Sequence, residues 1–299
     1  MILYEDIKKI YDKLKNTKGG KNASYIKELA KVNPNLYAIS IYTIDGQQID
    51  IGDYKHEFAI ESCSKIFTLA LALEKHNVSY IKKHIGEQSS KEKFNSICAV
   101  DYISNHTINA FDNAGAMATT SLLYKPNKVQ YINSIVSNMS DFAGRKLHVN
   151  QKIYNAEISE IDRNLAIAHL LKSHGRFYND VDKCVDAYTK QCSVMVTSQD
   201  VAVMACTLAN NGVNPKTGAR LVSKKNTEYI IQHMHLNGLY DGTDVWRDEI
   251  GVPMKSGISG ILLLVVPGVM GISIISPPLN AQSNSVKGMK TAKLIHKLL

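Results

Sequence analysis

A serine and a lysine in the segment 57–74 have a spacing that can support nucleophilic catalysis. Ser62 and Lys65 are three residues apart, so a helix places both side chains on one face, one turn apart. A serine hydroxyl attacks an acyl group once a base takes its proton, and a partly buried lysine can be neutral enough to do so. The start of a helix also offers N–H donors to a developing oxyanion. The pair therefore predicts acyl transfer through a serine ester.

The Ser-x-x-Lys spacing alone is not specific, because any such pair can be a surface serine beside a solvated lysine. The same spacing occurs in three lysine-rich polar segments, at Ser24/Lys27, Ser79/Lys82 and Ser90/Lys93. Ser62/Lys65 differs because the apolar run 66–73 that follows it drives its helix into a core. We therefore take Ser62 as the candidate nucleophile and Lys65 as the candidate base.

A second motif, Lys255-Ser256-Gly257, directly precedes an apolar strand predicted over 261–266. In penicillin-recognising acyl-serine enzymes a Lys-Thr/Ser-Gly strand lines the cleft opposite the serine. The simpler interpretation is a loop lysine before an ordinary strand. The segment 216–218 also reads Lys-Thr-Gly, but it lies in a Pro/Gly loop with no apolar strand after it. We therefore favour 255–257 as the segment that lines the cleft.

Glu157 and Asn164 are seven residues apart, which places them near one face if 157–174 is a single helix. A carboxylate and an amide pointing into a cleft could hold the ammonium and carboxylate groups of an amino acid. Spacing alone fits a solvated helix face equally well. Tyr188 and Tyr240 have no special standing from composition, since the chain contains 15 tyrosines. Asn113, which precedes Ala-Gly-Ala, is similarly ambiguous by itself.

Composition excludes several classes of function. Lys and Arg outnumber Asp and Glu by 35 to 27, yet there is no arginine-rich arm or basic-aromatic repeat, so nucleic acid is not an expected partner. The five cysteines and scattered histidines form no close ligand cluster, so we expect reduced thiols, no metal and no cofactor. The charged N-terminus and the Pro267-Gly268 break in the longest apolar stretch indicate a cytoplasmic protein without a membrane partner.

Periodicity predicts strands near both ends of the chain and helices between them. The predicted helices outside the central region cover 2–14, 24–32 and 283–298, and the predicted strands cover 37–44, 48–51, 261–266 and 269–275. This order favours an α+β fold in which the terminal strands form one antiparallel sheet. We expect a single domain over 1–299, with a sheet lobe at about 1–60 and 250–299. A helical lobe at about 61–249 would leave the active site between the two lobes.

The ordered set of motifs resembles the serine-dependent glutaminases, which share the β-lactamase/transpeptidase-like fold. The resemblance runs from about residue 20 to residue 289. The matching segments are 25–30, 62–67, 94–96, 113–116, 157–164, 186–188, 205–215, 238–241, 255–257, 276–279 and 284–288. It implies hydrolysis of L-glutamine to L-glutamate and ammonia through a γ-glutamyl-serine intermediate. It also implies a homodimer or homotetramer.

The resemblance assigns a role to each matched residue. Ser62 would be the nucleophile, Lys65 its activating partner, and Tyr188 and Tyr240 the tyrosines that relay protons. The backbone N–H groups of Ser62 and Ile258 would form the oxyanion hole. The substrate-binding positions that it implies are Tyr25, Glu61, Ser62, Asn113, Glu157, Asn164, Tyr188, Tyr240 and Ile258.

Three residues depart from the family pattern. Ile258 replaces a valine, a change that should matter little because its backbone is the functional part. Glu61 stands before the nucleophile where the family usually has glutamine, and its carboxylate could raise the pKa of Lys65. Ala110 replaces a proline, so the loop that carries Asn113 is expected to be less rigid.

Two other functions fit part of the pattern. The same acyl-serine chemistry could act on another amide or a β-lactam, but such a substrate has no free α-ammonium for Glu157. Alternatively, a catalytically weakened homologue could act as a binding protein. Retention of Ser62, Lys65, Tyr188 and Tyr240 argues against that alternative.

Overall fold

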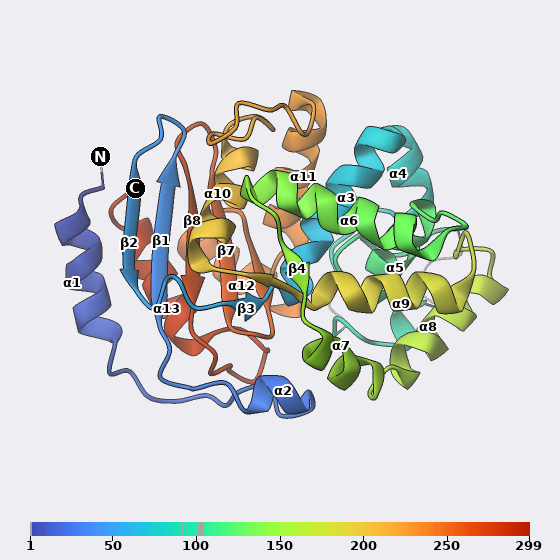
Figure 1. Ribbon diagram of the computed structural model, residues 1–299, viewed down its shortest axis with the longest axis horizontal. Coiled ribbons are helices and arrows are strands. Elements are labelled where there is room, and N and C mark those ends of the chain that lie inside the picture. The colour runs from blue at the N-terminus through green and yellow to red at the C-terminus, as the bar shows by residue number, and fades with distance from the viewer. Residues whose placement is uncertain (1, 91–92, 101–104) are drawn as a thin grey trace.

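A computed structural model describes residues 2–90, 93–100 and 105–299 (Figure 1). Its larger sheet has five antiparallel strands in the order β2-β1-β8-β7-β6. Their bounds are Ala38–Thr43 for β1, Gln48–Gly52 for β2, Met254–Gly257 for β6, Ile261–Val266 for β7 and Met270–Ile275 for β8. β1 pairs with β8 so that Ile39 opposes Ile274. The predicted α+β fold, with the terminal strands in one antiparallel sheet, is confirmed.

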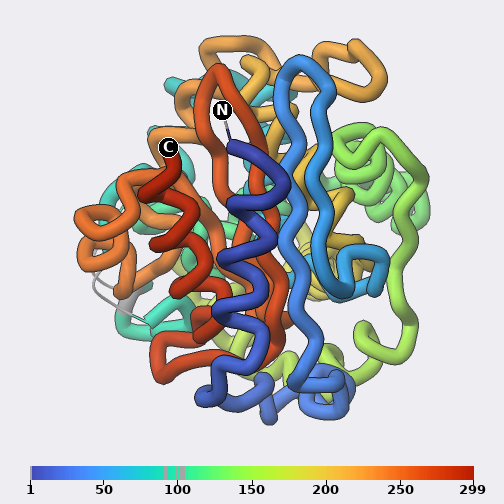
Figure 2. The backbone as a smooth tube through the Cα atoms, turned by 90° about the vertical axis from the view of Figure 1, so that its left-hand side faces the viewer, coloured from blue at the N-terminus to red at the C-terminus, as the bar shows by residue number. Residues whose placement is uncertain are grey.

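Helices cover both faces of this sheet. α1 (Tyr4–Leu14) and α13 (Val286–His296) lie side by side on one face, where Figure 2 shows the two ends of the chain together. α10 (Ser198–Ala209) packs on the other face, against β8 and β1. A Cβ at Gly271 of β8 would lie 2.1 Å from the backbone nitrogen of Cys206, so a residue without a side chain lets α10 approach this closely.

The helical lobe is built around α3 (Ser64–Lys75), the helix that follows Ser62. All residues of α3 from Ser64 to Leu73 are buried except Leu71. Every residue of its neighbour α5 (Asn113–Leu122) is also buried. The remaining helices are α2 (Lys27–Ala30), α4 (Val78–His84), α6 (Lys128–Ala143), α7 (Gln151–Ile158), α8 (Asp162–Ser173), α9 (Val181–Cys192), α11 (Lys224–Asn237) and α12 (Thr243–Ile250). The run of apolar residues after Lys65 therefore forms a central, almost fully buried helix, as the sequence predicts.

A second sheet was not predicted. It consists of three very short strands in the order β3-β5-β4, with β3 at Phe58–Ala59, β4 at His148–Val149 and β5 at Val194–Val196. Immediately after β3, the N–H of Ile60 donates to the carbonyl oxygen of Val194 over 2.8 Å. This sheet fixes the chain to the helical lobe just before Ser62.

Two predicted helices were wrong in extent. The segment 157–174 is not one helix: α7 ends at Ile158 and α8 begins at Asp162. Ser159 ends α7 because its hydroxyl donates to the carbonyl oxygen of Ala156 over 2.7 Å and competes with the helical pattern. The helix predicted over 24–32 is only the four-residue α2.

Among the described residues, no helix is long and apolar enough to cross a membrane.

Candidate active site

Ser62 lies in a short 3₁₀ helix, η1 (Glu61–Cys63), that leads directly into α3. Strand β6 packs against this turn. A Cβ at Gly257 would lie 3.1 Å from the carbonyl oxygen of Ile60 and 3.3 Å from the Cβ of Glu61, so the glycine allows the close approach. The Cys63 thiol donates to the carbonyl oxygen of Lys255 over 3.4 Å. The serine turn is therefore held between the two lobes.

Lys65 is almost completely buried, with 1% of its surface exposed. Its Nζ donates to the carbonyl oxygen of Phe111 and to Asn113 Oδ1, both over 2.7 Å, and to the Tyr240 hydroxyl over 3.3 Å. None of these partners carries a negative charge. Burial therefore dominates and lowers the pKa of Lys65 to about 8, although Asp112 nearby works in the opposite direction. A substantial neutral fraction at mildly alkaline pH makes Lys65 a competent base.

Two tyrosines and two asparagines extend this contact set. The Tyr240 hydroxyl interacts with the Ser62 side chain as well as with Lys65. The Tyr188 hydroxyl donates to Asn113 Oδ1 over 3.1 Å, and Asn113 Nδ2 donates to Asn164 Oδ1 over 3.1 Å. Ser62, Lys65 and Tyr240 therefore form one contiguous group that can exchange protons.

The site also contains two residues with unusual backbone angles. Glu61 has φ of +49° and Tyr240 has φ of +56°, a left-handed conformation that residues other than glycine rarely adopt. Such strain persists only where surrounding contacts enforce it. The Tyr240 hydroxyl contacts Ser62 and Lys65, whereas the Glu61 side chain contacts Glu157.

A cavity of about 250 Å³ lies directly beside Ser62, which forms part of its lining. The predicted site residues that line it are Tyr25, Glu61, Ser62, Asn113, Glu157, Asn164, Tyr188 and Ile258. Lining residues for which the sequence predicts no role are Ile26, Phe94, Asn95, Glu160, Arg163, Thr189 and Cys192. Phe94, Asn95 and Arg163 belong to segments of the family resemblance, which was the one signal that could have identified them. Residues from η1, α5, α7, α8 and α9 thus meet in one polar cavity.

The motif Lys255-Ser256-Gly257 lies behind the cavity and is absent from its lining. The Lys255 side chain is completely buried, and its Nζ lies 3.9 Å from the centre of the Tyr240 ring. Nζ also donates to the carbonyl oxygen of Ser256 over 2.9 Å. Burial lowers the pKa of Lys255 well below its usual range, and Lys65 lowers it further. Lys255 therefore supports Tyr240, while Gly257 supports the serine turn.

Comparison with known proteins identifies the family. The family model described as Glutaminase matches residues 20–299. The chain belongs to the glutaminase family. A glutaminase of Nostoc sp. is 40% identical over 291 residues, which are 97% of this chain and 87% of that protein. A glutaminase of Mycobacterium marinum is 41% identical over 277 residues, covering 93% of this chain and 87% of that protein.

Solved structures of glutaminases have the same fold. Probable glutaminase ybaS has a TM-score of 0.96 and 38% identity, and the match covers 98% of this chain and 95% of that chain. Mglu in its glutamate form has a TM-score of 0.93 and 32% identity, covering 99% of this chain and 68% of that chain. The β-lactamase-like fold expected from the sequence is thereby confirmed.

In this member of the glutaminase family, Glu61 affects the pKa of Lys65 in the expected direction, but the effect is small. The sequence predicted that the Glu61 carboxylate would raise the pKa of Lys65. The Glu61 carboxylate contributes in that direction, but burial has the larger effect and lowers the pKa of Lys65 to about 8. Glu61 is itself buried, and burial followed by the neighbouring Glu157 raises its own pKa well above the usual range.

The departure at Ala110 is accompanied by a contact that proline could not make. The backbone N–H of Ala110 donates to His233 Nε2 over 3.1 Å, and proline has no N–H. His233 also packs edge-to-face on Phe111, with 4.8 Å between ring centres. This contact holds the backbone whose carbonyl at Phe111 binds Lys65. The loop expected to be less rigid thus has an additional tie to α11.

His233 makes a testable contribution to acid stability. Burial lowers the pKa of His233 to about 3, whereas an exposed histidine titrates near 6.5. As the pH falls below about 6.5, the unfolded chain gains a proton that the folded protein excludes, and stability is lost until the pH reaches about 3. Between pH 7 and pH 4 this histidine alone should cost about 3 kcal/mol.

We expect His233→Gln, whose amide oxygen can still accept from Ala110, to lose about 3 kcal/mol less stability than the parent over that pH range. Urea unfolding of the two proteins at pH 7 and pH 4 measures the difference. His169→Gln, which replaces an exposed histidine of α8, is the matched control. Equal losses in the parent and His233→Gln would contradict the assignment.

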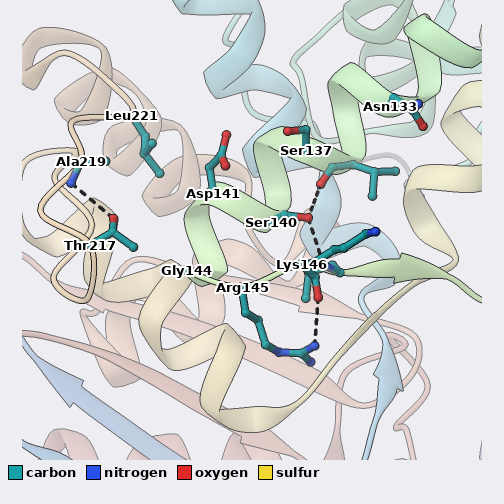
Figure 3. A pocket seen from close by; sticks show the side chains of 12 residues that line it. Asn133, Ser137, Ser140, Asp141, Gly144, Arg145, Lys146, Thr217, Ala219 and Leu221 are labelled. Atoms are coloured by element: carbon teal, nitrogen blue, oxygen red, sulfur yellow. Dashed lines mark hydrogen bonds between the residues drawn. The ribbon is translucent and has the colours of Figure 1, made fainter.

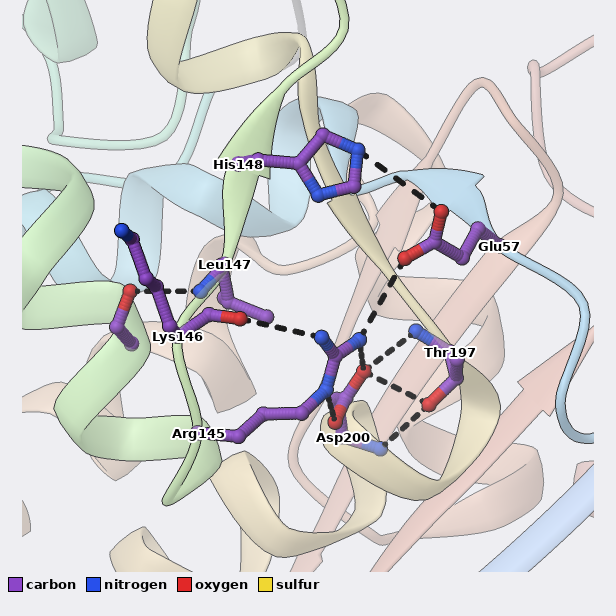
Figure 4. Close-up of polar contacts among 8 residues, drawn as sticks. Glu57, Arg145, Lys146, Leu147, His148, Thr197 and Asp200 are labelled. Carbon is purple, nitrogen blue, oxygen red and sulfur yellow. Dashed lines mark hydrogen bonds and ion pairs between the residues drawn. The ribbon is translucent and has the colours of Figure 1, made fainter.

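A larger open groove of about 910 Å³ lies at the C-terminal end of α6 (Figure 3). It contains none of the predicted site residues. The charged group beside it is structural (Figure 4): Arg145 donates from Nε and Nη2 to the two Asp200 oxygens over 2.7 and 2.6 Å. Asp200 also accepts from the N–H of Thr197, which caps α10. This pair attaches the end of α6 to the start of α10.

Proposed function

We propose that the protein hydrolyses the side-chain amide of L-glutamine to L-glutamate and ammonia through a γ-glutamyl ester on Ser62. The observation that carries this proposal is the contact set of Ser62, Tyr240 and Lys65 at the base of a polar cavity. Lys65 in its neutral form accepts the Ser62 proton by way of the Tyr240 hydroxyl. The Ser62 oxygen then forms a bond to the amide carbon.

The remaining steps use the same groups. The backbone N–H groups of Ser62 and Ile258 stabilise the oxyanion of the tetrahedral intermediate. The proton held by Lys65 passes to the amide nitrogen as its bond to carbon breaks, and ammonia leaves. Water then attacks the ester and gives a proton to the same base. The base returns this proton to the Ser62 oxygen as the ester C–O bond breaks, which releases glutamate and free Ser62. Tyr188 holds Asn113, which in turn holds the Lys65 ammonium in place.

The cavity favours a free α-amino acid over other amides. Glu157 provides a negative charge for an α-ammonium group, and Asn113, Asn164 and Tyr25 provide donors for an α-carboxylate. A β-lactam or an internal peptide residue has no α-ammonium and would leave the Glu157 carboxylate without a partner. Glutamine provides both the α-ammonium and the α-carboxylate group that these residues bind, and its side-chain amide then lies at Ser62.

Ammonia release from glutamine by the purified protein tests the proposal. Glutarate monoamide, which is glutamine without its α-amino group, is the matched control substrate. We expect its kcat/KM to be lower by roughly 10²-fold or more, because a buried carboxylate loses its cation. No ammonia release from glutamine would favour the binding-protein alternative, and equal use of both substrates would favour a less selective amidohydrolase.

We also propose a homodimer or homotetramer, as the family resemblance implies, and a cytoplasmic location. The five cysteines, Cys63, Cys98, Cys184, Cys192 and Cys206, are free thiols, which suits a reducing compartment. Sedimentation velocity at micromolar concentration would distinguish a dimer from a tetramer.

A further inference from the structure

Two carboxyl groups meet in the cavity although they come from different elements. Glu61 lies in η1 beside Ser62, and Glu157 lies in the last turn of α7. Only 3% of the Glu61 surface is exposed, and the two side chains are within hydrogen-bonding reach of one another. An ionised carboxylate can only accept a hydrogen bond. Contact between these two groups therefore requires a proton on one of them.

Among the described residues, no Lys or Arg forms an ion pair with either carboxyl, although Arg163 lines the same cavity. Glu61 Oε1 and Glu157 Oε1 are both buried without a hydrogen-bond partner among the described residues. The Lys65 ammonium is directed to Phe111, Asn113 and Tyr240 instead. The titratable groups that face the pair from the elements around it are Tyr25, Cys63, Lys65, Tyr188 and Cys192. Two buried acceptor oxygens are thus available to a ligand that brings its own positive charge.

We propose that Glu61 works as an un-ionised carboxylic acid that donates a hydrogen bond to the Glu157 carboxylate, so that the pair carries one negative charge and receives the α-ammonium group of the substrate. This inference deepens the proposed function and rests on it. A protonated carboxyl has one donor and one free acceptor, as a glutamine amide does. Glu61 therefore substitutes for a neutral side chain without adding a second charge.

The electrostatics assign the proton to Glu61. Burial raises the pKa of Glu157 to about 7, and its hydrogen bond with Glu61 works against that rise. The pKa of Glu61 is raised well above its usual range. Glu61 is also the more deeply buried of the two, with 3% of its surface exposed whereas Glu157 is half-buried, so Glu61 keeps its proton while Glu157 ionises as the pH rises. Below about pH 7 both groups are protonated, and the pair loses its attraction for an ammonium group.

Glu61→Gln tests the protonation state, because glutamine keeps the donor and the acceptor but can never ionise. At pH 8 we expect any rise in the KM for glutamine in Glu61→Gln to be well below the rise in Glu157→Gln, because an un-ionised Glu61 has no charge for the variant to remove. Glu157→Gln should raise the KM by more than about tenfold, because the charge that receives the ammonium is gone. A KM increase of more than about tenfold in folded Glu61→Gln would overturn the proposal, since an ionised Glu61 would then be required.

Infrared spectroscopy gives a readout that does not depend on activity. At pH 8 the parent protein should show the carbonyl stretch of an un-ionised carboxylic acid, which shifts in D2O. The band should be lost in Glu61→Gln and kept in Glu160→Gln, a glutamate at the same cavity. Absence of the band from the parent protein would overturn the proposal even if no variant folds. If the band is present but glutamine is not hydrolysed, the proposed function fails while the carboxyl pair stands.

Discussion

Ser62→Ala is expected to lower kcat for glutamine hydrolysis by at least about 10³-fold while the protein stays folded. The reason is that the hydroxyl provides the atom that forms the ester. Ser62 lies in a turn whose backbone is fixed by β3 and β6 through Ile60 and Gly257, so loss of the hydroxyl leaves the fold unaffected. Ammonia release and thermal unfolding, measured on the same preparation, separate the two effects.

Ser64→Ala is the matched control for this prediction. Ser64 belongs to the same motif and is buried, but its hydroxyl contacts Gln191 and Cys192 instead of the group around Lys65. Loss of the Ser64 hydroxyl should lower the stability of the fold and have little effect on kcat. An electrophilic glutamine analogue should modify the parent protein and Ser64→Ala at Ser62, and mass spectrometry should detect no adduct in Ser62→Ala. Residual hydrolysis by Ser62→Ala above a tenth of the parent rate would rule out Ser62 as the nucleophile.

The elements that could be predicted from the sequence are those with a strong local pattern. α9 (Val181–Cys192) lies in the central region where periodicity predicts helices, because its apolar face recurs at helical spacing and Asp180 caps it. The hairpin of β7 and β8 is likewise present, with Pro267 and Gly268 at its turn. The two-residue strands β3 and β4 have no period to detect, and they exist only because β5 lies between them.

The site shows the same difference between local patterns, which the sequence reveals, and nonlocal contacts, which it does not. The Ser62/Lys65 spacing is local, so the pattern was visible in the sequence together with the helix that positions it. The partners that set the chemistry are nonlocal: Lys65 binds the backbone carbonyl of Phe111, which no side-chain motif can indicate. The contact between Glu61 and Glu157 joins η1 to α7 across the cavity, and the spacing of these two residues in the sequence could not indicate it. Burial, which lowers the pKa of Lys65, follows from packing of the whole helical lobe.

Lys65→Met, which keeps the length of the side chain and removes the amine, is expected to lower kcat by roughly 10²- to 10⁴-fold. Lys65 acts as a base only when neutral, and its pKa lies at about 8. In the parent protein, kcat should therefore rise with pH through a limb centred near pH 8 and level off above it. Lys65→Arg should be as inactive as Lys65→Met, because a guanidinium stays charged throughout this range.

Lys255→Met provides the control that separates base catalysis from the loss of a buried lysine. Lys255 is also fully buried and also contacts the Tyr240 ring, yet its amine lies behind the cavity. Its replacement should loosen Tyr240 and lower kcat, but the limb near pH 8 should remain because Lys65 still titrates. Rate profiles from pH 6 to pH 10 for the parent and Lys255→Met test this directly. Two results would assign the base to a group other than Lys65. One is a shift of the pH 8 limb in Lys255→Met, and the other is activity of Lys65→Met above a tenth of the parent.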